Sequence, residues 1–196
     1  MVYRLSPTAL SAKNRAARAL WAVVWTLFYR PTPRPMHAWR CALLRLFGAK
    51  LGRGVHPYPS ARIWAPWNLE MGDHSCLGPH VDCYCMAVIK IGAYSTVSQY
   101  SYLCTASHNY LSLKMPLVAA PITIGERVWI TADVFVGPGV TVGDGSVVLA
   151  RSTVFKSVDP WMVVGGNPAK LIKARVLEQD TEVNGNYPPT FDGSEE

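Results

Sequence analysis

Residues 122–154 read ITIGERVWITADVFVGPGVTVGDGSVVLARSTV, and an aliphatic side chain returns in this stretch at every sixth position. These positions are Ile124, Ile130, Val136, Val142, Val148 and Val154, and glycine follows three of them. An α-helix would scatter every sixth residue around its axis, so the pattern is not helical. A two-residue alternation would give an ordinary strand, but it would not select the glycines.

The same rhythm extends back to residue 51. Further anchors in this phase are Leu51, Ile63, Met71, Leu77, Ile91, Val97 and Leu103, with Pro57 and Cys83 as poorer members. A small or β-branched residue stands four positions after nearly every anchor, as Val128 stands after Ile124. Two extra residues enter before Met71 and before Ile91. Residues 109–123 break the rhythm, so we predict that they loop out.

A triangular coil explains both the anchors and the glycines. Each side is a short strand whose anchor points inward, and glycine occupies a corner, where the backbone conformation is demanding. Three sides of six make about 18 residues per coil, and such coils stack about 4.8 Å apart like neighbouring strands. The sequence therefore predicts a mainly β fold, in which residues 51–166 form a parallel β-helix of about five triangular coils.

Other structure is predicted on both sides of the coils. Residues 1–50 are expected to form a basic helical extension, because their apolar residues recur at helical spacing. A short capping helix is expected at 167–177, with Asn167 as its N-cap and Pro168 in its first turn. Residues 178–196 hold six acidic residues and no Lys or Arg, which is typical of a loose tail.

The overall composition excludes several classes of protein. Of the 196 residues, 49% are apolar and 16% are charged, which is too apolar for a disordered chain. The sequence contains no run of 18 apolar residues, so it does not predict a membrane-spanning helix. The five cysteines do not resemble a disulfide framework, so we expect a reducing, cytoplasmic compartment.

Positive charge is concentrated at the N-terminal end. Residues 1–53 carry ten Lys or Arg and no Asp or Glu. Such an extension suggests an anionic partner, and Trp21, Trp25 and Trp39 suit a membrane interface. Contact with the inner face of the cytoplasmic membrane is one hypothesis, and packing on the coils or on another subunit is the alternative. Nucleic acid is not expected, because aromatic and basic residues do not interleave on a recognisable binding module.

Three motifs carry a family resemblance. The ladder at 124–146, closed by the run VGGNPAK at 164–170, resembles the hexapeptide-repeat acyltransferases. The run LCTASH at 103–108 is similar to their sugar O-acetyltransferase branch. The basic head, with RPTPRP at 30–35 and HAWR at 37–40, resembles the colanic-acid-type exopolysaccharide acetyltransferases.

The resemblance implies a left-handed β-helix, a homotrimer and an enzyme. The implied reaction transfers acetyl from acetyl-CoA to a sugar hydroxyl in exopolysaccharide or surface-glycan biosynthesis, on an acceptor that a lipid could carry. Two alternatives stay open, because the same repeat serves several functions. The first is a non-catalytic hexapeptide-repeat scaffold, and the second is a protein like the γ-carbonic anhydrases.

His108 is the catalytic candidate. It ends a hexad just before the predicted loop, so we expect it at a prism corner under a flap. Acyl transfer to a hydroxyl needs a base, for which imidazole is suited, and the resemblance places the catalytic histidine here. A structural histidine is the alternative. Its orienting partner stays open between a backbone carbonyl and Glu126, because Asn109 stands where many relatives have an acid.

Asp82, Tyr84 and Asn109 are the candidates for binding the acceptor. Asp82 suits a sugar hydroxyl, and Tyr84 suits stacking on a sugar ring; a solvated turn and simple packing are the respective alternatives. Asp82 shares the hexad phase of His108, and we expect the two on different corners of one prism. They would then approach each other only across a subunit contact.

Recognition of the acyl donor is expected in the last coils. The resemblance implies that backbone groups near Ala132 and Ala150 hold the pantetheine arm of acetyl-CoA. Lys156, Lys170 and Lys173 are cations available for its phosphates, with simple solvation of each as the alternative. No metal is expected, because a zinc site of the carbonic anhydrase kind needs three histidines and none follows the catalytic candidate.

Overall fold

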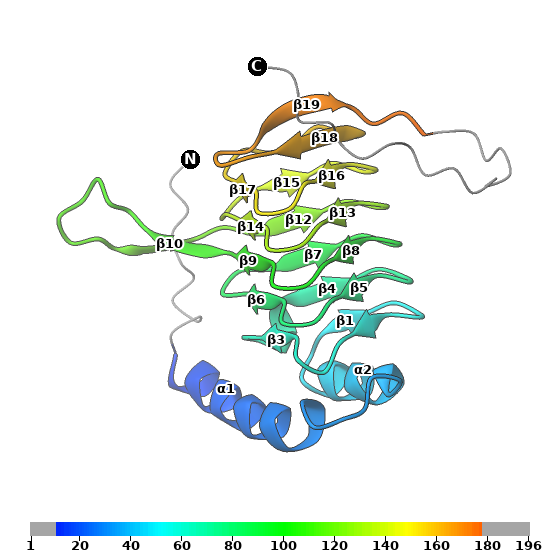
Figure 1. Ribbon diagram of the computed structural model, residues 1–196. Coiled ribbons are helices and arrows are strands. Elements are labelled where there is room, and N and C mark those ends of the chain that lie inside the picture. The colour runs from blue at the N-terminus through cyan, green and yellow to red at the C-terminus, as the bar shows by residue number, and fades with distance from the viewer. Residues whose placement is uncertain (1–10, 178–196) are drawn as a thin grey trace, which may run out of the picture.

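Residues 11–177 are described by a computed structural model, in which three sheets wind into a prism (Figure 1). Sheet A contains β1 (Lys50–Leu51), β4 (Leu69–Met71), β7 (Ile89–Ile91), β12 (Ile122–Ile124) and β15 (Thr141–Val142). Sheet B contains β2 (His56–Pro57), β5 (Cys76–Leu77), β8 (Thr96–Val97), β13 (Trp129–Ile130), β16 (Val147–Val148), β18 (Met162–Gly165) and β19 (Lys170–Ala174). Sheet C contains β3 (Arg62–Ile63), β6 (Asp82–Tyr84), β9 (Tyr102–Cys104), β14 (Phe135–Val136) and β17 (Thr153–Val154).

The chain visits sheets A, B and C in turn, and each coil pairs in parallel with the one before it. Lys50 pairs with Glu70 and Glu70 with Lys90, so the early coils advance by 20 residues. Thr123 pairs with Thr141, so a later coil advances by 18. The extra pairs of residues lie between sheets C and A, where the first coil makes the 3-10 turn η3 (Pro66–Asn68). The predicted solenoid and its two slips are confirmed.

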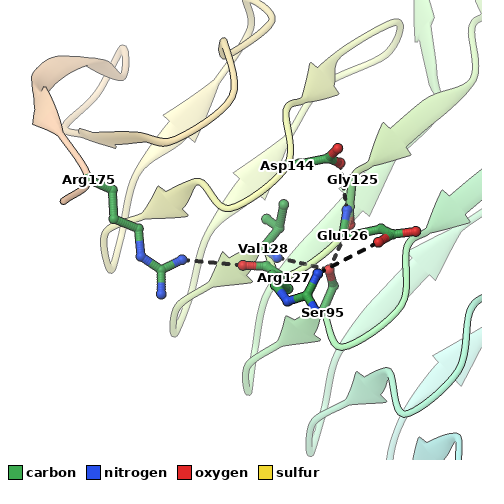
Figure 2. A network of polar contacts seen from close by, with 7 residues as sticks. All are labelled: Ser95, Gly125, Glu126, Arg127, Val128, Asp144 and Arg175. Atoms are coloured by element: carbon green, nitrogen blue, oxygen red, sulfur yellow. Dashed lines mark hydrogen bonds and ion pairs between the residues drawn. The ribbon is translucent and has the colours of Figure 1, made fainter. Parts of the chain in front are cut away.

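The anchors of the six-residue rhythm form the core. All of them are buried except Leu51, which is half-buried. Buried serines satisfy the backbone at the corners: Ser95 Oγ donates to Gly125 O at 2.7 Å and accepts from Val128 N at 2.9 Å (Figure 2). A buried polar backbone group without a partner is costly. Small hydroxyl residues therefore recur at corners that bury both an N–H and a carbonyl.

Two helices close one end of the prism, opposite β18 and β19 (Figure 1). They are α1 (Ala12–Val24), which continues as the π-helical turn η2 (Trp25–Tyr29), and α2 (His37–Leu46). The indole of Trp21 donates to Ile63 O at 2.7 Å, and that of Trp25 donates to Ala61 O at 2.9 Å. The tryptophans therefore face the coils, because their N–H groups find strand carbonyls there.

The remaining apolar residues of these helices point outward. Leu20, Val23, Leu27 and Phe28 on α1 and η2 are exposed, as are Trp39 and Leu46 on α2. The apolar stripe that predicted the first helix is thus divided between a packed tryptophan face and an exposed aliphatic face. Among residues 11–177, no helix is both long and apolar enough to span a bilayer.

The predicted capping helix at 167–177 is wrong. β18 and β19 form an antiparallel hairpin. Arg175 Nη1 donates to Gly145 O at 2.6 Å and to Arg127 O at 3.3 Å, and Figure 2 shows the second of these bonds. The last coil presents a row of unpaired strand groups, and a returning strand satisfies them as a helix cannot. The tail predicted at 178–196 and the first ten residues of the predicted extension lie outside the described residues.

The predicted loop starts at 109 rather than at 106, and its last two residues, 122 and 123, belong to β12. The chain leaves the prism after Thr105 as an antiparallel hairpin of β10 (Ala106–His108) and β11 (Leu117–Ala119). It rejoins the prism at β12, whose residues Ile122 and Ile124 are buried. Thr105 itself is fully buried in the coil. We call residues 106–119 the arm, and Figure 1 shows it projecting sideways from the coils.

Candidate active site

His108 lies on the arm rather than at a prism corner, so that expectation is wrong. The side chain is exposed, and its Nδ1 lies 2.6 Å from the carbonyl oxygen of Met115 on the other side of the arm. A carbonyl oxygen only accepts, so Nδ1 carries a proton, and in the neutral ring Nε2 then keeps its lone pair. The orienting contact in the structure is therefore a backbone carbonyl. Glu126 instead lies beside Arg127, with 4.0 Å between the charged groups (Figure 2).

Asn109 is half-buried and shapes the turn of the arm. Its backbone N–H donates to Pro116 O at 3.0 Å, and its Oδ1 accepts from Leu111 N at 3.1 Å. These two bonds connect both sides of the segment between His108 and Met115 and stabilise its turn. The amide therefore supports the position of the imidazole through the backbone.

Asp82 and Tyr84 lie half-buried on β6, facing out of sheet C. Burial raises the pKa of Asp82, and the nearby Arg62 opposes that shift. Asp82 pairs in register with Tyr102 of the next coil, whereas His108 has already left the prism on the arm. The structure thus does not bring Asp82 and His108 together within one protomer.

Tyr84 belongs to a column of aromatic rings along the outside of sheet C. The column consists of Trp64, Tyr84, Tyr102, Phe135 and Phe155, and we call it the aromatic ladder. Successive ring centroids are 5.4 to 6.4 Å apart. Burial, followed by contact with Cys104, raises the pKa of the Tyr102 hydroxyl. Neighbouring ring planes are inclined by 53° to 77°, so the rings pack edge to face along the sheet.

The predicted donor residues divide between two regions. Ala132 and Ala150 lie on successive coils at the corner between sheets B and C, where Arg151 N donates to Ala132 O at 3.0 Å. The arm leaves the prism at a different corner, between sheets C and A. One protomer therefore presents its two alanines and its imidazole on separate corners.

The three predicted lysines lie near the far end of the prism. Lys156 borders a hollow of about 230 Å³ that is lined by apolar residues including Met162 and Leu171. Lys170 and Lys173 lie on β19. All three are exposed, and none forms an ion pair with another residue in the range 11–177.

The histidines do not gather into a metal site in the described part of the chain. His74 stacks on Tyr94 at the corner between sheets A and B, with 5.2 Å between ring centroids, whereas His108 lies on the arm. No group of three or more His, Cys, Asp or Glu within residues 11–177 is arranged to hold a metal ion.

One feature escaped prediction: a pocket of about 600 Å³ between α1 and the outer face of sheet C. Arg18 and Trp25 line it from the helix end, and Arg62, Trp64 and Asp82 line it from the strands. The residues named on the two walls are 37 to 64 positions apart in the sequence, so no local pattern could predict the pocket. An excess of arginine in the N-terminal region was its one visible signal.

Solved structures define the class of the protein. The hexapeptide-repeat-containing acetyltransferase VCA0836 of Vibrio cholerae matches with a TM-score of 0.77 and 29% identity, over 84% of this chain and 94% of that one. A second structure of that protein, with acetyl coenzyme A bound, has a TM-score of 0.76, again with 29% identity, over 85% of this chain and 91% of that one. A galactoside acetyltransferase in complex with coenzyme A shares the fold, with a TM-score of 0.77, 24% identity and 84% of each chain covered. The predicted left-handed β-helix class is confirmed.

A curated relative assigns the family. No family model matches the chain. The WcaF protein of Escherichia coli K12, which is named for colanic acid biosynthesis acetyltransferase activity, is 46% identical over 170 residues. The match covers 87% of this chain and 93% of WcaF. The chain belongs to the WcaF family of hexapeptide-repeat acetyltransferases, as its motifs predicted.

Proposed function

We propose that this protein transfers acetyl from acetyl-CoA to a sugar hydroxyl during exopolysaccharide or surface-glycan assembly, with His108 as general base. The observation that carries the proposal is the exposed imidazole on the arm, whose Nδ1 is engaged by Met115 O. Nε2 is thereby left for a substrate. The name of WcaF supports the glycan context, and the acetyl coenzyme A complex of the Vibrio cholerae protein supports the donor.

The proposed reaction is a direct transfer. Nε2 of His108 takes the proton of the acceptor hydroxyl while its oxygen attacks the thioester carbonyl carbon. The carbon–sulfur bond then breaks, and the imidazolium returns the proton to the departing sulfur. The Met115 carbonyl accepts a hydrogen bond from Nδ1–H, so it favours the cationic ring during transfer. Alignment of the two substrates supplies the rest of the rate enhancement.

The residues near the end of the prism fit the chemistry of the donor. Two alanines on adjacent coils add little bulk to their corner, which suits a narrow arm such as pantetheine. Lys156, Lys170 and Lys173 supply exposed positive charge for phosphate groups. In this proposal the alanine corner holds the thioester arm and the lysines attract the phosphates.

A complete site is proposed to need a second copy of the chain. The donor corner and His108 lie on different corners of one protomer, and the arm reaches away from its own coils (Figure 1). A neighbouring copy placed beside the arm would supply the missing corner. A closed ring of three prisms, as the family resemblance implies, gives every arm a partner.

The outward face of the helical end is proposed to contact an anionic membrane. Leu20, Val23 and Leu27 are each more than half exposed on one side of the helix. Lys13 and Arg34 are exposed cations of the same helical end, and neither pairs with an acid within the described residues. Exposed apolar side chains together with cations are typical of helices that lie on a bilayer. This placement would bring the enzyme to lipid-carried acceptors.

The test of the catalytic proposal is His108→Asn. We expect kcat to fall roughly 100- to 10,000-fold in an assay of thiol release from acetyl-CoA with a glycan panel. The melting temperature should hold, because the replaced ring is exposed.

His74→Asn is the matched control. His74 is also exposed, and it stacks on Tyr94 away from the arm. Its turnover should equal that of the unmodified protein. Equal turnover of the His108→Asn variant would remove His108 from its role.

A further inference from the structure

The pocket between α1 and sheet C carries more positive charge than its own structure uses. Arg18, Arg30 and Arg62 line it, and Asp82 is the one acid among the lining residues. None of the three guanidinium groups lies within 4.0 Å of a carboxylate in the described part of the chain. The pocket therefore has a net positive charge, which favours binding of an anion.

Aromatic rings hold two of these arginines in place. The guanidinium of Arg18 lies 4.1 Å from the centroid of the Trp64 ring, and its Nε donates to Asn14 Oδ1 at 3.1 Å. The guanidinium of Arg30 lies 5.5 Å from the ring of Trp25. Stacked guanidinium groups lose less freedom on binding and keep their remaining N–H donors available.

Apolar and polar groups suited to a sugar lie beside the arginines. Trp64 begins the aromatic ladder, so one ring borders both the pocket and the outer face of sheet C. Asp82 is half-buried and can accept hydrogen bonds from hydroxyl groups. An arginine cluster alone would suit any anion, but arginines, a tryptophan and a carboxylate together suit an anion attached to a sugar.

We infer that this pocket binds the acceptor through an anionic group on the sugar, either a phosphate or a carboxylate. Arg18, Arg30 and Arg62 hold the anion, and Asp82 receives a sugar hydroxyl. The ligand's role as acetyl acceptor rests on the proposed function, but the binding of an anionic sugar does not depend on acetyl transfer. The pocket also adjoins the helix proposed to face the membrane, as a sugar joined to lipid through phosphate would require.

The test is a calorimetric titration of the full-length protein with four probes. Glucose 1-phosphate and glucuronic acid carry the two kinds of anion, methyl α-glucoside is neutral, and inorganic phosphate has no sugar. We expect at least one anionic sugar to bind about tenfold more tightly than both the neutral sugar and inorganic phosphate. The tighter of the two anionic sugars identifies the group.

Variants connect that binding to the pocket. Arg18→Gln and Arg62→Gln should each weaken binding of the preferred sugar about tenfold. Arg15→Gln removes an exposed cation from the same helix outside the pocket lining, so it should leave the affinity unchanged. Circular dichroism melting establishes that each variant is folded.

Three results would overturn the inference. They are equal affinity for neutral and anionic sugars, equal affinity for inorganic phosphate and the sugar phosphate, and undiminished binding by both pocket variants. Acetyl transfer is measured separately by thiol release. A protein that binds the anionic sugar without transferring acetyl contradicts the proposed function alone, and an active protein indifferent to the anion contradicts this inference alone.

Discussion

Thr105 shows how a single buried hydroxyl fixes the point where the arm departs. It is fully buried, its Oγ1 donates to Tyr84 O at 2.7 Å, and the same oxygen accepts from Ala87 N at 3.0 Å. One side chain thereby satisfies two backbone groups of the preceding coil. The Thr105 carbonyl also accepts from Ala120 N at 2.9 Å, which closes the base of the arm.

Thr105→Val removes both side-chain bonds while keeping the shape of the residue. We expect a loss of about 1 kcal/mol in the free energy of unfolding, because the backbone N–H of Ala87 loses its partner. The carbonyl of Tyr84 keeps its bonds from Thr105 N at 3.2 Å and Met86 N at 3.1 Å. Urea unfolding measures this loss. Thr141→Val, at an exposed strand position, is the control and should change stability little. A loss that is equal in the two variants would contradict this role.

At the residue scale, the environment of a side chain could be predicted from the sequence only within the six-residue rhythm. Inward anchors such as Leu77 and Val136 followed from the six-residue rhythm because each coil imposes the same environment. The partner of His108 could not be chosen, since Met115 reaches it only through the register of β10 and β11. The charge around Asp82 was also hidden, because Arg18 arrives from a distant helix.

At the scale of elements, the arm behaves as an addition to the solenoid. Its two strands pair with each other, and Leu111, Leu113 and Met115 near its turn are exposed. The coil beneath it stays continuous, because β7 pairs directly with β12 across the insertion. The arm therefore positions His108 for the proposed chemistry and contributes little to the core.

Replacing residues 108–117 with Asn-Gly tests that separation. Ser107 and Val118 face each other across the arm, and Asn-Gly is favoured in two-residue hairpin turns. We expect a melting temperature within about 5 °C of the original, since little apolar area is removed from the core. Acetyl transfer should be lost together with His108. Failure of this variant to fold would show that the arm belongs to the core.

The elements outside the rhythm were predicted less well, for physical reasons. The helix at 167–177 was inferred from Asn167 and Pro168 as local capping signals, but the open edge of the last coil selects a strand instead. The helices at the other end were predicted from apolar spacing, which cannot tell which side meets the prism. Indole hydrogen bonds from Trp21 and Trp25 decided that orientation.

At the scale of the whole molecule, the two ends of the prism differ. One end carries helices with exposed aliphatic side chains and exposed cations, and the other carries β18 and β19 (Figure 1). Charge concentrated at one end orients a molecule that approaches an anionic surface. The proposed membrane contact through the helical end would therefore orient the whole prism, with its axis upright on the membrane surface.

Replacing Val23 and Leu27 together by Glu tests this orientation. Sedimentation with anionic vesicles should fall about tenfold or more, because two inserted apolar side chains are lost and two negative charges are gained. The control is Leu171→Glu, at a position comparably exposed on β19 at the opposite end. Unchanged sedimentation of the double variant would contradict membrane contact, and conversion of a trimer to monomers would identify the face as a subunit contact.

The coil that bears the arm has a further consequence. Lys90 pairs with Thr123, so this one coil spans 33 residues between neighbours of 20 and 18, yet the strands above and below it stay in register. The extra length is accommodated outside the stack, where lengthening a hairpin costs little closure entropy. A chain built in this way can exchange or resize this segment without disturbing the register of its scaffold.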